Sequence, residues 1–226
     1  MRPSCVVRNI QRPDPAIAAG LAELGVATVH ESQSRSGLMN EDLRPVIPDV
    51  RVCGPAVTVL CHTGDNLMLH AAIELLQPGD VLAVATVSPT RCGMVGELIA
   101  HALQGRGAAG LILEACVRDV AELRKMGLPI WSKGISASGT VKASAGWVNV
   151  PIVCGGAIVN PGDLVVADDD GVVVVPRDDA ARVLEAGRAR EAKEKVSRER
   201  IGRGELSLDY NKLRDVLARE GVVYVG

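Results

Sequence analysis

The stretch of the chain that decides the fold reads GMVGELIA at residues 93–100 and GLILEACVRD at residues 110–119. In the first part, apolar residues recur at helical spacing and predict a helix with one buried face, namely Val95, Leu98, Ile99, Ala102 and Leu103. The second part is an apolar run typical of a buried strand, and Asp119 opens a further helix. Alternating strands and helices with short connections predict a sheet with helical crossovers.

The residues before this stretch extend the same pattern. Residues 52–61 and 81–87 read as strands, and residues 67–76 as a helix between them. Asp14 and Pro15 predict the capped start of an earlier helix that Gly25 closes, with a second short helix over residues 26–31.

Beyond Pro129 the pattern changes to short strands with glycine-rich turns, which predict a small β layer packed on the first sheet. Asn160-Pro161-Gly162-Asp163 repeats the Pro-Gly-Asp turn of residues 78–80 without repeating its flanks, so we interpret it as shared turn chemistry and not as duplication.

From Arg177 the chain becomes charged and helical, with helices predicted from Ala180 to about Arg203 and from Leu208 to Arg219. Glu191 with Lys195 and Glu194 with Arg198 are i,i+4 pairs of a solvated helix, which is also able to meet a neighbouring subunit. We predict a single domain, with an α/β catalytic core over residues 1–177 and a C-terminal helical extension over residues 178–226.

Composition excludes several functional classes. Phe is absent and aromatic residues make up 2% of the 226 residues, so the core must be aliphatic and stacking platforms for nucleic acid are nearly missing. The net charge of −2 gives no electrostatic footprint for nucleic acid. No run of about 18 apolar residues and no apolar signal core occur, so we predict a cytoplasmic protein that does not engage a membrane.

The six cysteines form no C-x-x-C pair, so neither a zinc knuckle nor a disulfide framework is indicated. We interpret most of them as small buried apolar residues. Cys92 and Cys116 lie at either end of the central stretch, and a nucleophilic role stays open for them.

Two features of the central stretch carry chemistry. Gly93–Glu97 predicts a loop-to-helix junction whose amides favour an anion, although glycines of a tight turn would look the same. Arg118-Asp119 follows a buried strand, the usual address of functional loops in α/β sheets. Asp119 with Glu122 also resembles a helix cap, whereas the planar fork of Arg118 suits a substrate carboxylate.

Other motifs point to structure. Asp168-Asp169-Asp170-Gly171 lacks the spacing and closing Glu of a calcium loop, so we interpret it as a turn between strands. His30 and Glu31 read as polar residues on a helix face. The lysines form no convincing Schiff-base site.

At these residues the sequence resembles the metal-dependent aldolases that cleave 4-hydroxy-4-methyl-2-oxoglutarate and 4-carboxy-4-hydroxy-2-oxoadipate, a family related to the regulator of ribonuclease E activity. The most specific mark is a carboxylate followed after about twenty residues by Arg-Asp, here Glu97 and Arg118-Asp119. Further resemblance lies at residues 7–10, 25–31, 55–59, 64–66 and 167–175. The regulator branch lacks the acidic residue after the arginine and the long C-terminal helices, so the resemblance favours the enzyme branch.

The resemblance implies a layered ββα core of the swivelling-domain type and the following site. Asp119 would ligate Mg²⁺ or Mn²⁺, with Glu97 holding metal-bound waters. Substrate would bind Arg118 and the backbone amides near Gly96, Glu97 and Leu98. His30 and Glu31 are further implied catalytic residues and would line the site. Glu194, with Glu191 as the alternative, would reach the site from an adjacent subunit of a trimer or hexamer.

The implied reaction releases pyruvate as an enolate, which a cation beside Arg118 would stabilise. A metal-activated water, or a carboxylate acting through one, is our hypothesis for the base. Oxaloacetate decarboxylation gives the same enolate and is the expected side activity, in a pathway of aromatic-acid breakdown. Two alternatives stay open, a non-catalytic regulator that binds a protein such as a ribonuclease, and a dedicated oxaloacetate decarboxylase.

Overall fold

The computed structural model describes residues 3–226 and divides the chain into two compact units, one ending at Gly187 and one beginning at Arg188. The first unit is built on a ten-stranded sheet. Its strands are β1 Cys5–Val6, β2 Arg44–Pro45, β3 Val52–Cys61, β4 Val81–Thr86, β5 Gly93–Val95, β6 Gly110–Val117, β7 Ile130–Ile135, β8 Trp147–Val148, β11 Leu164–Asp168 and β12 Gly171–Val175. The main strand order is β1-β8-β3-β4-β6-β7-β2, with β5 paired to β6 and the β11–β12 hairpin paired to β3.

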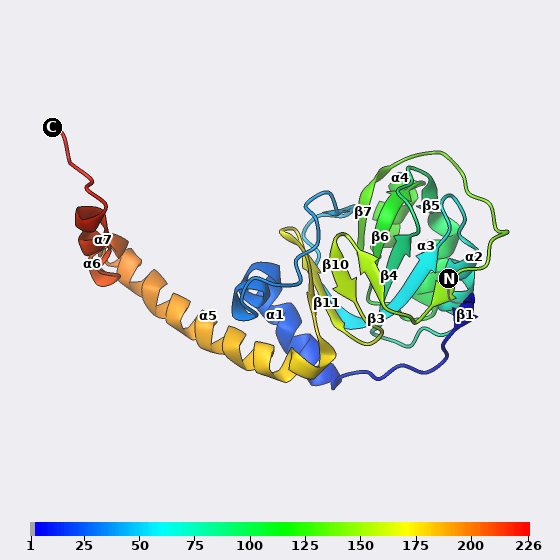
Figure 1. Cartoon of the computed structure of the whole chain (residues 1–226), viewed down its shortest axis with the longest axis horizontal. Helices are drawn as coiled ribbons and strands as arrows, with labels where there is room; N and C mark the ends of the chain where they lie inside the picture. The colour runs from blue at the N-terminus through cyan, green and yellow to red at the C-terminus, as the bar shows by residue number, and fades with distance from the viewer. Residues whose placement is uncertain (1–2) are drawn as a thin grey trace. The chain divides into compact units, whose positions relative to one another are not determined.

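The centre of this sheet is parallel, as the sequence predicts. Strands β3, β4, β6 and β7 run in one direction, and the helices α2 (Leu67–Ile73), α3 (Glu97–Gly105) and α4 (Val120–Met126) connect them. All three helices cover one face, where Leu69, Leu103 and Leu123 are fully buried against the sheet (Figure 1). Parallel strands need such crossovers, so their carboxyl ends and the following loops meet at one edge.

The opposite face of the sheet carries a β layer. Strands β9 (Ile152–Cys154) and β10 (Ala157–Val159) form a separate antiparallel pair, whose apolar residues pack on Ala83, Ala85 and Ile112 of the sheet. The layered α/β fold class with a C-terminal helical part is therefore confirmed. The β11–β12 hairpin corrects part of the prediction, because its hydrogen bonds to β3 make it an extension of the sheet.

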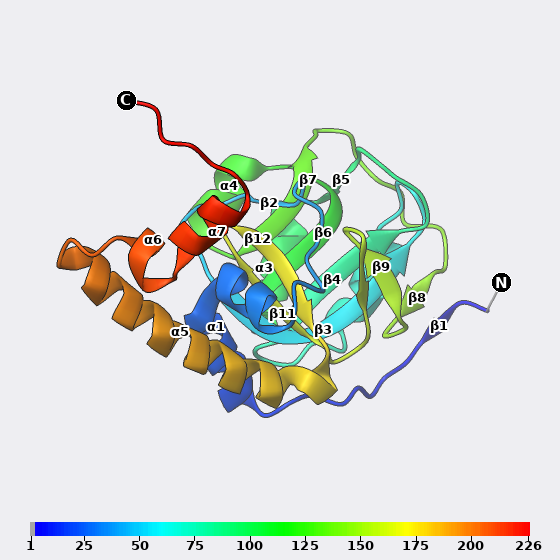
Figure 2. The same cartoon turned by 60° about the vertical axis from the view of Figure 1, so that its left-hand side comes forward.

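Helix α1 (Pro15–Ser32) covers the β11–β12 hairpin (Figure 2). Asp14 caps its start, as predicted, with its Oδ1 accepting from the Ala16 amide at 2.8 Å. Gly25 has a φ of 77° and breaks the helix into the two predicted segments. Only glycine adopts this left-handed geometry at little cost.

The remaining helices are η1 (Arg177–Asp179) and α5 (Ala180–Gly202), whose first residues belong to the first unit, and α6 (Ser207–Tyr210) and α7 (Leu213–Arg219) of the second. The second predicted C-terminal helix is thus two short helices, because Lys212 has a left-handed φ of 56° between them. Within the second unit the Arg200 guanidinium lies 4.4 Å from the Tyr210 ring centre and pairs with Glu205 at 2.7 Å. None of the helices between residues 3 and 226 is long and apolar enough to cross a membrane.

Candidate active site

A pocket of about 430 Å³ opens where β6 ends and α3 begins. The polar and charged side chains that line it are Asn66, His70, Glu97, Arg118, Asp119, Thr140 and Lys142. They come from four separate parts of the sequence. Both ends of the predicted central stretch, Gly96-Glu97 and Arg118-Asp119, therefore lie in one cavity.

Glycine at position 96 is what allows these two ends to meet. A Cβ at Gly96 would lie 2.2 Å from Asp119 Oδ2 and 3.0 Å from Arg118 Cγ. The Arg118 amide also donates to the Val95 carbonyl at 2.9 Å, which fixes the end of β6 beside the start of α3. Close approach of the two segments, and not a positive φ, explains this glycine.

Asp119 does not play the capping role that its spacing to Glu122 allows. It occupies the position before α4 with φ 57° and ψ 37°, and its side chain caps none of the described amides of that helix. Its Oδ2 instead accepts from the Glu97 amide at 3.2 Å and lies 3.6 Å from Arg118 Nε. The left-handed conformation costs about 1 kcal/mol in a non-glycine residue, and such strain is concentrated at functional sites.

Helix α3 begins at the pocket with Gly96 and Glu97. The first amides of a helix lack intrahelical partners and carry the positive end of its dipole, so this end favours an anionic group. The Glu97 side chain lies 3.5 Å from His101 on the same helix and is 45% exposed. Leu98 corrects the predicted buried face, because it is 82% exposed at the pocket while Ile99, Ala100 and Leu103 are buried. Ala102 is likewise exposed, and Val95 belongs to β5.

The donor set fits a hard divalent cation that keeps most of its water. Glu97 and Asp119 place two carboxylates in the pocket. Among residues 3–226, no three or more His, Cys, Asp or Glu side chains are grouped as a metal site formed by protein ligands alone would require. Asn66 adds a buried amide oxygen, Oδ1, that accepts no hydrogen bond from the described residues and can take one from an ordered water. Mg²⁺ and Mn²⁺ prefer such oxygen-rich surroundings with several water ligands.

The other predicted site residues lie elsewhere. His30 and Glu31 are in the last turn of α1 and do not line this pocket, and Glu31 Oε1 accepts from Arg35 Nε at 3.0 Å. Glu194 lies on α5 in the second unit, where it pairs with Arg190 at 2.9 Å and with the predicted partner Arg198 at 3.8 Å. The catalytic roles of His30, Glu31 and Glu194, with Glu191 as the alternative, stay predictions about an assembled oligomer.

Sequence reasoning missed four polar pocket residues, Asn66, His70, Thr140 and Lys142. Asn66 belongs to the Gly64-Asp65-Asn66 segment that resembles the aldolase family, but no role follows from its spacing. Thr140 and Lys142 lie in a segment without regular structure. Only the tertiary contacts of that segment bring it to the pocket.

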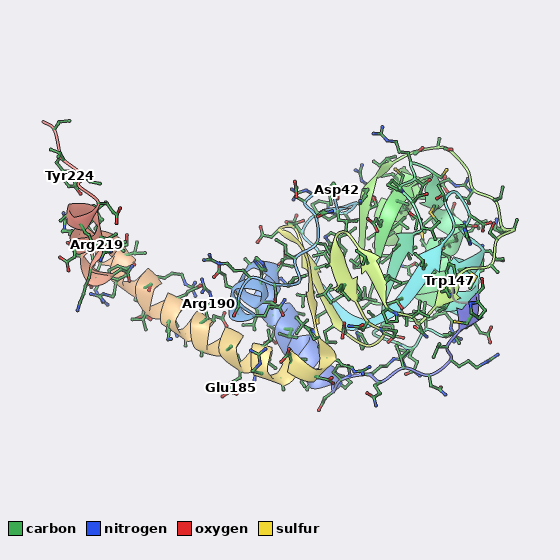
Figure 3. The ribbon with its side chains drawn as sticks, in the orientation of Figure 1. Asp42, Trp147, Glu185, Arg190, Arg219 and Tyr224 are labelled. Atoms are coloured by element: carbon green, nitrogen blue, oxygen red, sulfur yellow. The ribbon has the colours of Figure 1, made fainter. Side chains whose placement is uncertain are left out.

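A larger hollow of about 750 Å³, lined by Lys133 and Asp42 among others, is a weaker candidate. The Lys133 ammonium lies 3.1 Å from Glu114 and 3.4 Å from Asp42, the latter in the loop before β2 (Figure 3). Burial alone would lower the pKa of Lys133, but its hydrogen bond to Glu114 and the charges of both carboxylates raise it. A raised pKa disfavours the neutral amine that a Schiff base requires, and the two carboxylates already compensate the charge of Lys133.

The remaining candidates have structural explanations. Burial raises the pKa of the Cys116 thiol, which opposes a nucleophilic thiolate there. Asp168-Asp169-Asp170-Gly171 is the predicted turn between β11 and β12. Asp168 Oδ2 accepts from the Val26 amide and Oδ1 from the Asp170 amide, both at 2.9 Å, so the fold uses this carboxylate itself.

Residues 22–174 match the family described as "RraA-like: Aldolase/RraA". The chain belongs to this family. A relative from Halalkalibacterium halodurans, named "Putative 4-hydroxy-4-methyl-2-oxoglutarate aldolase", is 32% identical over 74% of this chain and 80% of its own length. A relative of the same name from Burkholderia multivorans is 33% identical over 68% of this chain and 94% of its own length.

A solved structure from the ribonuclease-inhibitor branch has a similar fold. Streptomyces coelicolor RraAS2, described as an unusual member of the RNase ES inhibitor RraA protein family, matches with a TM-score of 0.73 and 30% identity over 84% of this chain and 99% of its own. Relatives of this RraA-like chain thus carry names from the aldolase branch and from the ribonuclease-inhibitor branch.

Proposed function

We propose that this RraA-like chain is a divalent-metal-dependent aldolase that cleaves 4-hydroxy-4-methyl-2-oxoglutarate or 4-carboxy-4-hydroxy-2-oxoadipate to pyruvate and a second oxoacid. The observation that carries the proposal is the placement of Asp119. Its carboxylate leaves its own helix uncapped and lies in a pocket with Arg118 and Glu97. An acidic residue after the arginine is also the feature that distinguishes the aldolase branch in the resemblance described above.

The chain's own residues supply binding and charge. The guanidinium of Arg118 offers several donors in a planar fork, which suits the carboxylate or the carbonyl oxygen of a 2-oxoacid. Its Nε lies 3.6 Å from Asp119 Oδ2, so the guanidinium and the carboxylate are neighbours in the pocket lining. The amides at the start of α3, near Gly96 and Leu98, favour the negative charge that develops as the C3–C4 bond breaks. A divalent cation held by Asp119, with Glu97 holding its waters, would supply Lewis-acid stabilisation of that charge.

Cleavage also requires that the C4 hydroxyl lose a proton. Glu97 and Asp119 are the carboxylates that line the pocket, and either can accept a proton through a water. Oxaloacetate decarboxylation leaves the same pyruvate enolate when CO₂ departs from C3. We therefore include it as a side activity, with a dedicated decarboxylase as the alternative.

The assembly forms part of the proposal. The lining of the pocket within one chain includes no side chain from α1 or α5, so Glu31, His30 and Glu194 would act only where subunits of a trimer or hexamer meet. Replacing Glu194 by Gln and, separately, Glu191 by Gln tests which residue matters. Lower kcat in only one variant, with an unchanged oligomer mass, assigns the role to that residue.

The second candidate is a regulator that binds a protein partner, which the likeness to RraAS2 favours. A pyruvate-release assay separates the two. Purified chain with Mg²⁺ or Mn²⁺ should release pyruvate from at least one of the two 4-hydroxy-2-oxoacids, and a chelator should stop it. Release from neither substrate would refute the aldolase, and faster turnover of oxaloacetate than of both would favour the dedicated decarboxylase.

A further inference from the structure

Lys142 is a pocket residue whose charge the fold does not use. Its ammonium forms no ion pair with any residue in the described chain, whereas Lys125 lies 2.8 Å from Glu122 and Lys133 lies 3.1 Å from Glu114. The side chain is exposed at a cavity that also holds Arg118. The pocket therefore contains two cationic side chains, and only Arg118 has an assigned part in the proposed reaction.

The backbone on both sides of Lys142 is fixed. The Val141 amide donates to the Gly64 carbonyl, and the Asn66 amide donates to the Val141 carbonyl, both at 3.0 Å. On the other side, Asp65 Oδ2 accepts from the amides of Ala143 at 2.9 Å and Ser144 at 2.6 Å. Although residues 142–146 form no helix or strand, their position beside α2 is set by a buried carboxylate.

Asp65 is suited to this task. It is 2% exposed, and its Oδ1 accepts a further hydrogen bond from the Leu67 amide at 2.9 Å. Burial alone would raise the pKa of this carboxyl, but the amides of Leu67, Ala143 and Ser144 lower it. Asp65 thus stays ionised and ties the start of α2 to the segment that carries Lys142.

The same segment passes Arg118. A Cβ at Gly139 would lie 3.6 Å from Arg118 Nη1, which is ordinary contact distance. Thr140 and Lys142 follow on the pocket wall. The fixed segment therefore runs from the guanidinium of Arg118 to the ammonium of Lys142 within four residues.

We propose that Lys142 binds the second carboxylate of the substrate, on the fragment that contains C4, and makes the site selective for 4-hydroxy-2-oxoacids with a carboxylate at each end. The inference rests on the proposed aldolase function. Arg118 binds the pyruvate half, and a compact ammonium on a flexible stem meets a carboxylate that differs in position between substrates. Lys142 then determines specificity without touching the bond that breaks.

The test compares two substrates that differ only at that end. 4-Hydroxy-4-methyl-2-oxoglutarate carries the second carboxylate, and 4-hydroxy-4-methyl-2-oxopentanoate has a methyl group in its place and would yield pyruvate and acetone. In Lys142→Met we expect KM for the first to rise about 10- to 100-fold, the usual loss for a charge-assisted contact. The kcat/KM for the second should stay within about twofold, and Lys142→Arg should restore most of the affinity for the first.

Exchange of the pyruvate methyl protons with deuterated solvent is the internal control, because it needs only the pyruvate half. The Lys142→Met variant should catalyse this exchange at the wild-type rate. The control variant Lys212→Met alters an exposed lysine of the second unit and should match wild type in every assay. Equal losses on both substrates, slower exchange, or trapping of Lys142 by borohydride would show that Lys142 acts at the pyruvate half and would overturn the inference. An unchanged KM for the dicarboxylate would overturn it as well.

The outcomes separate this inference from the function on which it rests. Wild-type chain that releases no pyruvate from any 4-hydroxy-2-oxoacid refutes both. Wild-type chain that is active, beside a Lys142→Met variant with unaltered substrate preference, refutes only the role of Lys142.

Discussion

Two acidic turns of this molecule follow buried strands, and they differ in what their carboxylates contact. The Asp168 side chain at the end of β11 is 12% exposed and accepts from the amides of Val26 and Asp170 at 2.9 Å. Asp119 after β6 has a side chain 43% exposed and accepts one amide at 3.2 Å. A carboxylate whose lone pairs are already used stabilises the fold, whereas one left partly exposed in a pocket is available to a ligand.

The largest expected effect comes from Asp119. Asp119→Ala should lower pyruvate release by about 10³-fold or more, because it removes the only proposed protein ligand of the cation. Thermal unfolding should change little, since the fold gives this side chain one amide hydrogen bond and an exposed ion pair. Asp119→Asn is the matched control and should be nearly as inactive, because it keeps the shape and removes the charge. Wild-type activity in either variant would disprove the assigned role.

Gly96→Ala should come next, with activity about 10²-fold lower, the scale expected when a catalytic group moves by about 1 Å. The new Cβ would meet Asp119 Oδ2 at 2.2 Å and Arg118 Nε at 3.1 Å. Both are side-chain atoms that can move aside, so the stability should fall little while the site is displaced.

Gly93→Ala provides the contrast to Gly96→Ala. Its Cβ would meet the Ser136 carbonyl oxygen at 2.3 Å, a backbone atom that cannot move aside alone. We expect this variant to lose more stability than Gly96→Ala, measured by denaturant unfolding. If both alanine variants lose stability to the same extent, the distinction between a glycine that faces backbone atoms and one that faces side-chain atoms fails.

Asp168→Ala should have the opposite profile to Asp119→Ala. The buried Val26 amide and the partly buried Asp170 amide lose their acceptor, which should cost about 1–3 kcal/mol of unfolding free energy. Arg51, 3.8 Å from the carboxylate and half exposed, adds little. Activity per folded molecule should stay near wild type, as measured by pyruvate release normalised to the folded fraction. A kcat loss at unchanged stability would place Asp168 in the site.

The parts of the fold that depend on local chemistry could be predicted from the sequence. The two Pro-Gly-Asp turns contain the same hydrogen bond, from a backbone amide to the carboxylate three residues later. Asp80 Oδ2 accepts from the Gln77 amide, and Asp163 Oδ2 accepts from the Asn160 amide, each at 2.8 Å. The parallel strands and the junction at Gly96 also follow from patterns within a few residues. Such features need no knowledge of distant segments.

The site depended on contacts that no local pattern contains. The spacing of Asp119 and Glu122 fits a cap, and only the left-handed φ of Asp119 directs its carboxylate to Glu97 instead. Leu98 fits a buried helix face, yet it lies where α3 borders the pocket and is exposed. Lys142 lines the pocket because the carboxylate of Asp65, which is 77 residues earlier in the sequence, accepts hydrogen bonds from the amides of Ala143 and Ser144.

Asp65 provides the finest test of the comparison, because it resembles Asp168 in its contacts although it lies beside the pocket. Amide donors lower its pKa below the ordinary value of 3.8, so the folded state prefers the ionised form. Asp65 therefore contributes stability that is present above the unfolded-state pKa and is lost as the pH falls through the lower folded-state pKa. The gap in unfolding free energy between wild type and Asp65→Asn should be constant near neutral pH and shrink as the pH falls below about 4.

The matched variant is Asp119→Asn, whose gap to wild type should be small near neutral pH because that carboxylate is partly exposed and has one amide partner. Unfolding by denaturant at a series of pH values measures both gaps. A gap for Asp65→Asn that does not narrow in acid would show that its three amide bonds do not favour the ionised form. The segment that carries Lys142 would then be held only by packing and by the backbone hydrogen bonds of Val141 to Gly64 and Asn66. Asp65 would no longer be an example of a carboxylate that stabilises the fold, in contrast to one that is available to a ligand.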